Sequence, residues 1–240
     1  MPRIHHVLCL AALASTLTRA QTETRDAMPV AKVSVRLRLA FPNLQTKRKL
    51  PPAVFWLKPV AGTPSLPFPA HGRYTLLQKN RMFTPHLLVI PVGSVVLFPN
   101  EDPFFHNVFS LFNGRRFDLG LYEAGTTKDV TFSREGVSYI FCNIHPEMSA
   151  VVVALSTPLY AIADASGAFQ LPDVPAGEYE LHVWVEGTPQ PSLDRLSRDV
   201  HLAPGAGDLG ELSMTAVPQE PVPHLNKFGR PYDQDSKPAY

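Results

Sequence analysis

The sequence predicts an all-β protein made of two successive sandwiches. Among its 240 residues, 25 prolines and 14 glycines interrupt the chain at short intervals, a pattern typical of strands joined by turns rather than of long helices. Between these breaks lie short apolar runs and segments that alternate apolar with polar residues. A chain of this length has room for one or two domains and a sizeable core.

The N-terminus has the pattern of a secretory signal peptide over residues 1–20. Arg3 supplies a positive start, residues 7–17 form an apolar stretch, and Ala20 is a small residue suited to cleavage. No later stretch is long and apolar enough to span a bilayer. We therefore expect a periplasmic or secreted protein without a membrane span.

The first sandwich is expected over residues 30–156, with its core over 74–156. Its first strand alternates, with Val35 and Leu37 on one side and Arg36 and Arg38 on the other. The spacing of the strands that follow is typical of a β-sandwich or barrel. The expected strands are 30–39, 53–57, 87–90, 95–98, 106–112, 127–133, 137–142 and 149–155.

A second, smaller sandwich is expected over residues 158–216. There, turn sequences such as Asp-Ala-Ser-Gly separate strands in which apolar and polar residues alternate. Further strands are expected at 199–202 and 209–214. Residues 217–240 are proline-rich and polar, which predicts an extended or disordered tail.

Charge and motifs exclude several classes of function. The formal net charge is +1, and no dense cluster of Lys and Arg suggests a nucleic-acid partner. The sequence contains neither a glycine-rich phosphate loop nor a nucleophile elbow. We expect a protein that is not itself an enzyme.

The chemistry-bearing segment is Phe141–Met148, FCNIHPEM. Removal of the signal peptide, with Cys9, leaves Cys142 as the single cysteine. In an oxidising compartment, an unpaired cysteine suggests an intermolecular disulfide, a reactive thiol, a metal-bound thiolate or an inert buried side chain. His145 and Met148 follow in the same turn, and this combination favours a metal.

An upstream histidine completes a ligand set. His106 begins the strand 106–112; if this strand lies beside the Cys142 strand, two imidazoles, one thiolate and the Met148 thioether meet. Two His and one Cys with a weak axial Met are the ligands of mononuclear blue copper. Zinc is less suited because a thioether is a poor ligand for it, and a dinuclear copper centre would need a second cysteine.

Residues 78–155 resemble the cupredoxin domain of plastocyanin and amicyanin, through HNV at 106–108 and CNIHPEM at 142–148. Nearly the whole mature chain is similar to bacterial proteins labelled "methylamine utilization protein". That pattern is carried by VPVGSVVLFPNEDPFFHNVFS, RFDLGLYEAG, CNIHPEMSAVVV, DVPAGEYELHVW and NKFGRPY. Residues 158–216 resemble the carboxypeptidase regulatory-like domain, a prealbumin-type sandwich.

The resemblance implies a site and a role. It makes His106, Cys142, His145 and Met148 the ligands of a type 1 copper ion, and it implies an exposed imidazole edge at His145. The residues expected around the ligands are Asn107, Phe105 and Pro146. In the resemblance, Asn107 would tie down the ligand loop. The phenylalanines around His106 are expected either to pack in the sandwich core or, at Phe104 or Phe105, to line an apolar rim around the copper.

The expected function is one-electron transfer with a redox protein partner, such as a cytochrome or a dehydrogenase. One alternative is a periplasmic copper-binding or copper-delivery protein. Another is a glycan- or protein-binding module, formed by residues 158–216, with a structural copper site.

Other polar and aromatic residues are expected to have ordinary roles. Glu101 and Asp102 look like a solvated turn, and His86 like a structural or surface residue. His182 is expected to face away from the core. Trp56 and Trp184 are expected to pack within their respective sandwiches.

Overall fold

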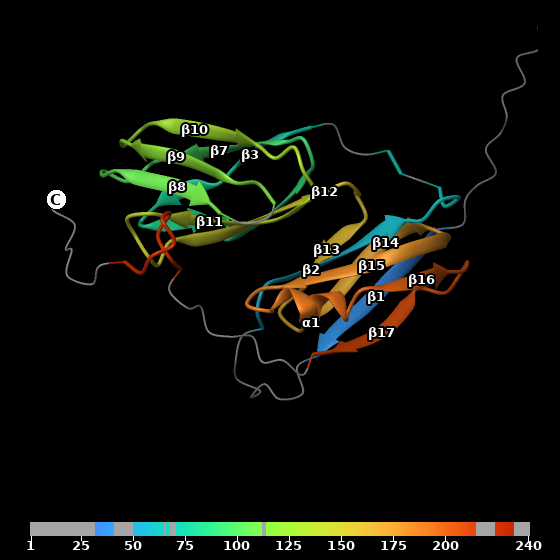
Figure 1. The fold of residues 1–240 in the computed structure, drawn as a ribbon. Helices are drawn as coiled ribbons and strands as arrows, with labels where there is room; N and C mark the ends of the chain where they lie inside the picture. The colour runs from blue at the N-terminus through green and yellow to red at the C-terminus, as the bar shows by residue number, and fades with distance from the viewer. Residues whose placement is uncertain are drawn as a thin grey trace, which may run out of the picture.

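The computed structural model describes residues 32–40, 50–64, 66–67, 71–111, 114–214 and 224–232. Apart from one short helix, α1 (Gln190–Asp194), the regular elements of these segments are strands, and they form two sandwiches side by side (Figure 1). The predicted all-β class is confirmed. In the described segments, no helix has the length and apolar character needed to cross a membrane. The expected signal peptide, residues 1–20, lies outside them.

The first sandwich contains a five-stranded sheet and a three-stranded sheet. The order in the larger sheet is β6 (Leu87–Pro91), β12 (Ser149–Leu155), β11 (Gly136–Cys142), β8 (His106–Ser110) and β9 (Phe117–Tyr122). The smaller sheet has the order β10 (Thr127–Thr131), β7 (Val95–Pro99) and β3 (Arg73–Thr75). A short hairpin of β4 (Leu77–Lys79) and β5 (Met82–Thr84) lies beside them.

The second sandwich also contains two sheets. One has the order β14 (Ala168–Pro175), β1 (Lys32–Ala40) and β17 (Asp208–Ser213). The other has the order β13 (Tyr160–Ile162), β2 (Ala53–Pro59), β15 (Gly177–Val185) and β16 (Arg198–Leu202).

The N-terminal strands therefore belong to the second sandwich, which corrects the expected first domain of residues 30–156. β1 lies between β14 and β17, and β2 lies between β13 and β15. The apolar face of β1 packs in the same core as Phe169 and Trp184. Trp56 pairs with His182 across β2 and β15, so Trp56 and Trp184 share one sandwich instead of lying in two.

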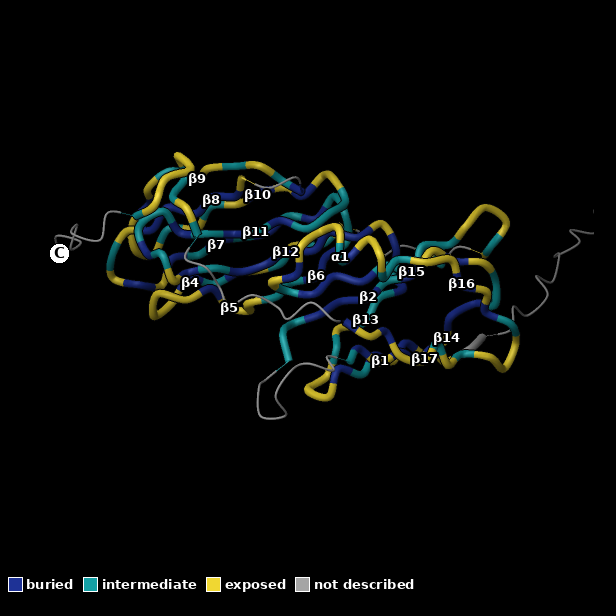
Figure 2. The backbone as a smooth tube through the Cα atoms, turned by 60° about the horizontal axis from the view of Figure 1, so that its bottom comes forward, coloured by how far each residue is buried: buried dark blue, intermediate teal, exposed yellow. Residues whose placement is uncertain are grey.

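The two sandwiches meet at β12, which is buried on both faces. Ala150, Val152 and Ala154 contribute to the core of the first sandwich, whereas Val151 and Val153 pack with the core of the second. Most of β12 has the dark blue of buried residues in Figure 2. Such double burial explains the continuous apolar run SAVVVAL, which lacks the alternation of a half-exposed strand. A hydrogen bond also joins the two sandwiches: Trp184 Nε1–H donates to the Tyr139 hydroxyl at 3.1 Å.

A short C-terminal segment corrects the expected tail. Residues 224–232, which we call the C-terminal strap, lie against the first sandwich, where Tyr232 Oη donates a hydrogen bond to the Cys142 carbonyl at 2.8 Å (Figure 1, red). Residues 215–223 and 233–240 are outside the described segments.

Candidate metal centre

The site forms where β8 and β11 run side by side. Val108 on β8 lies opposite Cys142 on β11. Opposed residues of an antiparallel pair share a face, as do residues two apart on one strand. His106 therefore points toward the same interior space as Cys142.

The turn after β11 brings a second histidine to this space. It is closed by hydrogen bonds from the Cys142 amide to the Met148 carbonyl, at 3.2 Å, and from the Met148 amide to the His145 carbonyl, at 3.0 Å. Because the chain folds back on itself between β11 and β12, His145 returns toward the Cys142 side chain.

The ligand atoms of His106, Cys142 and His145 all lie within 4.8 Å of one another. Cys142 Sγ is 3.5 Å from His106 Nδ1 and 3.6 Å from His145 Nδ1. All three side chains are buried. Among the described residues Cys142 is unpaired, so no disulfide competes for its sulfur.

These separations fit a common metal ion. At bond lengths of about 2.3 Å to sulfur and about 2.0 Å to nitrogen, two ligands about 120° apart lie about 3.7 Å from each other. The observed sulfur–nitrogen distances of 3.5 and 3.6 Å are close to this value. Met148 is also buried, with 1% of its surface exposed, in the core cluster that contains Cys142.

A carboxylate that the sequence analysis set aside lies behind one of the histidines. Asp102 Oδ2 is 2.9 Å from His106 Nε2, and only 4% of Asp102 is exposed. The expectation of a solvated turn at Glu101 and Asp102 is therefore wrong for Asp102. Its carboxylate also accepts hydrogen bonds from the amides of Asn80 and Arg81, at 2.6 and 3.0 Å.

These neighbours determine the protonation of His106. Burial by itself raises the pKa of Asp102, but hydrogen bonds from two backbone amides and from the His106 ring outweigh it, and the pKa falls below its usual value. An ionised Asp102 accepts a hydrogen bond from the N–H at His106 Nε2, which leaves the Nδ1 lone pair directed at the cysteine sulfur. Burial lowers the pKa of His106, although Asp102 acts in the opposite direction.

The other two members of the cluster are also held in uncharged forms. Burial, followed by the nearby His106, lowers the pKa of His145. Burial raises the pKa of the Cys142 thiol, and the surrounding backbone amides oppose this shift. A soft or borderline metal binds neutral imidazoles and a thiolate. The two imidazoles here are already neutral, and the thiol would lose its proton when the metal binds.

His145 is only 3% exposed, which corrects the exposed imidazole edge implied by the family resemblance. The centroid of the Phe104 ring lies 5.4 Å from the centroids of both the His145 and the His106 rings, so Phe104 packs against both. Within the described segments His145 Nε2 has no hydrogen-bond partner. Phe105, expected at an apolar rim, is 48% exposed beside His106.

Asn107 connects the two ligand segments. Its carbonyl accepts a hydrogen bond from the Asn143 amide at 2.9 Å, and its side chain donates one to Asp118 Oδ1 at 2.6 Å. The backbone of Asn107 thus holds the start of the ligand turn. Pro146 is half-buried within that turn.

The remaining histidines considered in the sequence lie elsewhere. His86 is exposed; its two ring nitrogens lie 3.1 Å from the Ser149 carbonyl and 2.6 Å from Glu186 Oε1. His182 is half-buried and stacks on Trp56, with ring centroids 5.3 Å apart. Neither belongs to the cluster around Cys142.

The sequence matches no protein-family model and no curated protein. Among solved structures, a purple cupredoxin from Nitrosopumilus maritimus is 26% identical, over 35% of this chain and 99% of that one, with a TM-score of 0.31. A copper(I) amicyanin variant is 19% identical over 35% of this chain and 82% of its own, with a TM-score of 0.33. A copper-containing nitrite reductase from Thermus scotoductus is 27% identical over 41% of this chain and 25% of its own, with a TM-score of 0.33. Since these scores are low, the assignment of the metal rests on the ligand atoms described above.

Proposed function

We propose that this protein binds one copper ion of type 1 and carries single electrons. The observation that supports the proposal is a buried cluster of two Nδ1 atoms and one Sγ atom. The sulfur of Cys142 lies 3.5 Å from His106 Nδ1 and 3.6 Å from His145 Nδ1. In the proposal, His106, Cys142 and His145 bind the ion and Met148 supplies a weak fourth ligand. Thiolate and thioether suit copper(I), while imidazole suits both oxidation states.

When bound, the ion supplies a one-electron change between copper(II) and copper(I). The protein's part is to keep the ligands still while the charge changes. His106 and Cys142 lie on paired strands, and Asp102 holds the outer nitrogen of the His106 ring. Both imidazoles are buried, and the Phe104 ring packs against them, which limits the access of water to the site.

Burial supports electron transfer over copper delivery. A delivery protein must release its ion to a receiver, which is easier when the ligands are open to solvent. Here His106, Cys142 and His145 are all buried, whereas an electron needs no open path. In this proposal the protein is a carrier and not an enzyme, and its partner is another redox protein, such as a cytochrome or a dehydrogenase.

The proposal places the protein in the periplasm or outside the cell, because of the signal peptide expected at residues 1–20. Binding of a glycan or a protein by the second sandwich remains a separate expectation. Since that sandwich includes β1 and β2, the fragment 158–216 would lack two of its strands. A binding assay should therefore use the full mature chain.

The decisive experiment is an absorption spectrum of the protein loaded with copper(II). We expect an intense visible band from thiolate-to-copper charge transfer, absent in Cys142→Ser, and a reversible one-electron potential. Loading with zinc should give a colourless protein, and added copper should displace the zinc. A colourless copper(II) form, or a preference for zinc over copper, would contradict the proposal.

A further inference from the structure

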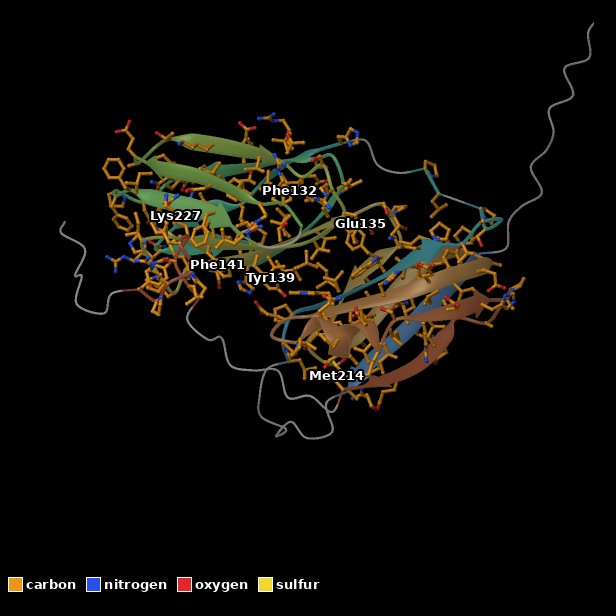
Figure 3. The ribbon with its side chains drawn as sticks, viewed as in Figure 1. Phe132, Glu135, Tyr139, Phe141, Met214 and Lys227 are labelled. Atoms are coloured by element: carbon orange, nitrogen blue, oxygen red, sulfur yellow. The ribbon has the colours of Figure 1, made fainter. Side chains whose placement is uncertain are left out.

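The C-terminal strap returns to the first sandwich after the chain has completed the second. Met214, next to the end of β17, lies in the core of the second sandwich. Figure 3 labels Met214 there, with Lys227 and Phe141 on the first sandwich. Lys227 Nζ is 2.8 Å from Asp118 Oδ2 on β9. The strap thus lies far in sequence from the strands that it contacts.

Two aromatic residues on the outer face of the five-stranded sheet are covered by the strap. Phe109 on β8 and Phe141 on β11 are paired, with ring centroids 5.8 Å apart. The His224 ring stacks on Phe141, at 4.1 Å and an interplanar angle of 25°, and lies 6.2 Å from Phe109. The strap therefore removes apolar surface from water directly behind the Cys142 strand.

Polar contacts from the strap end on the backbone and side chains next to the ligands. Tyr232 Oη donates to the Cys142 carbonyl at 2.8 Å. The Lys227 amide donates to Asn143 Oδ1, also at 2.8 Å. Lys227 Nζ pairs with Asp118 Oδ2. The other oxygen of the Asp118 carboxylate accepts a hydrogen bond from the Asn107 side chain at 2.6 Å. The strap thereby connects to residues adjacent to both His106 and Cys142.

The strap is shaped by its own hydrogen bonds. Asn226 Oδ1 accepts from the amides of Phe228 and Arg230, at 2.9 and 3.1 Å. The Asn226 amide donates to the Arg230 carbonyl at 2.8 Å, and Gly229 occupies the left-handed region with φ 73°. Because the turn is closed on itself, it presents Lys227 and Tyr232 in a preorganised arrangement.

We propose that Tyr232 and Lys227 are positioning residues for the ligand turn, acting through the Cys142–Asn143 peptide. The proposal rests on the proposed copper site. A peptide held at its carbonyl and at the next side chain cannot rotate freely, so the Cys142 sulfur keeps one orientation toward the two Nδ1 atoms. By linkage, copper binding then strengthens strap docking by the same factor as docking strengthens copper binding.

The first test uses the metal-free protein, so that it does not depend on copper. Amide hydrogen exchange is measured at Lys227, which reports undocking of the strap, and at Asn143 and Met148, which report opening of the turn. Tyr232→Phe keeps the ring and removes the hydroxyl, which donates to the Cys142 carbonyl and lies 3.3 Å from His224 Nδ1 within the strap. We expect exchange about fivefold faster at these amides. Arg230→Ala is the control, because this exposed residue joins the strap turn through its backbone.

The second test uses the copper-loaded variants. Tyr232→Phe should shift the charge-transfer band and the copper hyperfine splitting, and should release copper about fivefold faster to a chelator. A truncation that removes residues 218–240 should show larger changes of the same kind. Exchange and spectra equal to those of Arg230→Ala would overturn the positioning role. Should the wild type lack the visible band while Tyr232→Phe still speeds exchange, the type 1 assignment fails and the strap's hold on the turn stands.

Discussion

Replacing Asp102 by alanine tests whether this carboxylate holds His106 in place. The side chain accepts hydrogen bonds from the Asn80 amide at 2.6 Å, the Arg81 amide at 3.0 Å and the His106 ring at 2.9 Å. Asn80 and Arg81 have φ of 56° and 55°, a conformation that is costly for residues other than glycine. The carboxylate therefore supports a strained turn as well as a buried ring.

The expected loss follows from these contacts. A hydrogen bond to a charged group contributes about 1.5–3 kcal/mol, and a buried donor left without a partner costs about 1–3 kcal/mol. Asn80 and Arg81 are exposed, so water can replace part of their contacts, whereas His106 is buried and has no such replacement. We expect Asp102→Ala to lower the free energy of unfolding of the metal-free protein by about 3–5 kcal/mol.

The assay must report on the first sandwich, because Trp56 and Trp184 both lie in the second. Hydrogen exchange of the Val108 and Ile140 amides under increasing urea measures the stability of the first sandwich directly. Asp164 is the matched control: its carboxylate accepts hydrogen bonds from the Ser166 amide and hydroxyl and from the Ala168 amide, in an exposed turn. Because that turn joins β13 to β14 in the second sandwich, the loss for Asp164→Ala is measured by tryptophan fluorescence during urea unfolding. We expect a much smaller loss for Asp164→Ala. Equal losses for the two variants would refute the role assigned to Asp102.

Three further predictions concern the axial ligand, the strap and the N-terminal strand. Met148→Leu should retain copper and raise the reduction potential, because loss of the weak axial thioether disfavours copper(II); an unchanged potential in voltammetry would exclude Met148 as a ligand. Burial lowers the pKa of His224, while backbone carbonyls and Glu147 oppose this shift. His224 therefore binds a proton more readily when the strap is undocked. The contribution of His224 to strap docking should be fully present above pH about 6.5, and protonation should weaken docking as the pH falls below that value. Exchange of the Lys227 amide, corrected for its intrinsic rate, should show this dependence, and His224→Phe should abolish it. A Cβ on Gly207 would clash with the Ser34 carbonyl oxygen on β1, so Gly207→Ala should destabilise the second sandwich by about 1–3 kcal/mol. Tryptophan fluorescence during urea unfolding measures this loss, and a neutral effect would argue against the placement of β1.

Local pattern was sufficient to predict much of the molecule. Strand β12 was expected at 149–155 and lies at Ser149–Leu155, because an apolar run between breaks is a property of neighbouring residues. The spacing of Cys142, His145 and Met148 within one turn is likewise local, so a metal site could be inferred there before any coordinates. The position of His106 required only that two strands be neighbours.

What the sequence by itself determined is the all-β class, strands such as β12, and the side chains that we propose as ligands. Only the tertiary structure decided that β1 and β2 join the second sandwich, that Asp102 lies behind His106, and that the strap returns to Cys142. The physical reason is that a period of two specifies which face of a strand is buried but not against which strand. Burial of Asp102 and His145, and docking of Tyr232, depend on partners that are distant in sequence and selected by the packing of the whole chain.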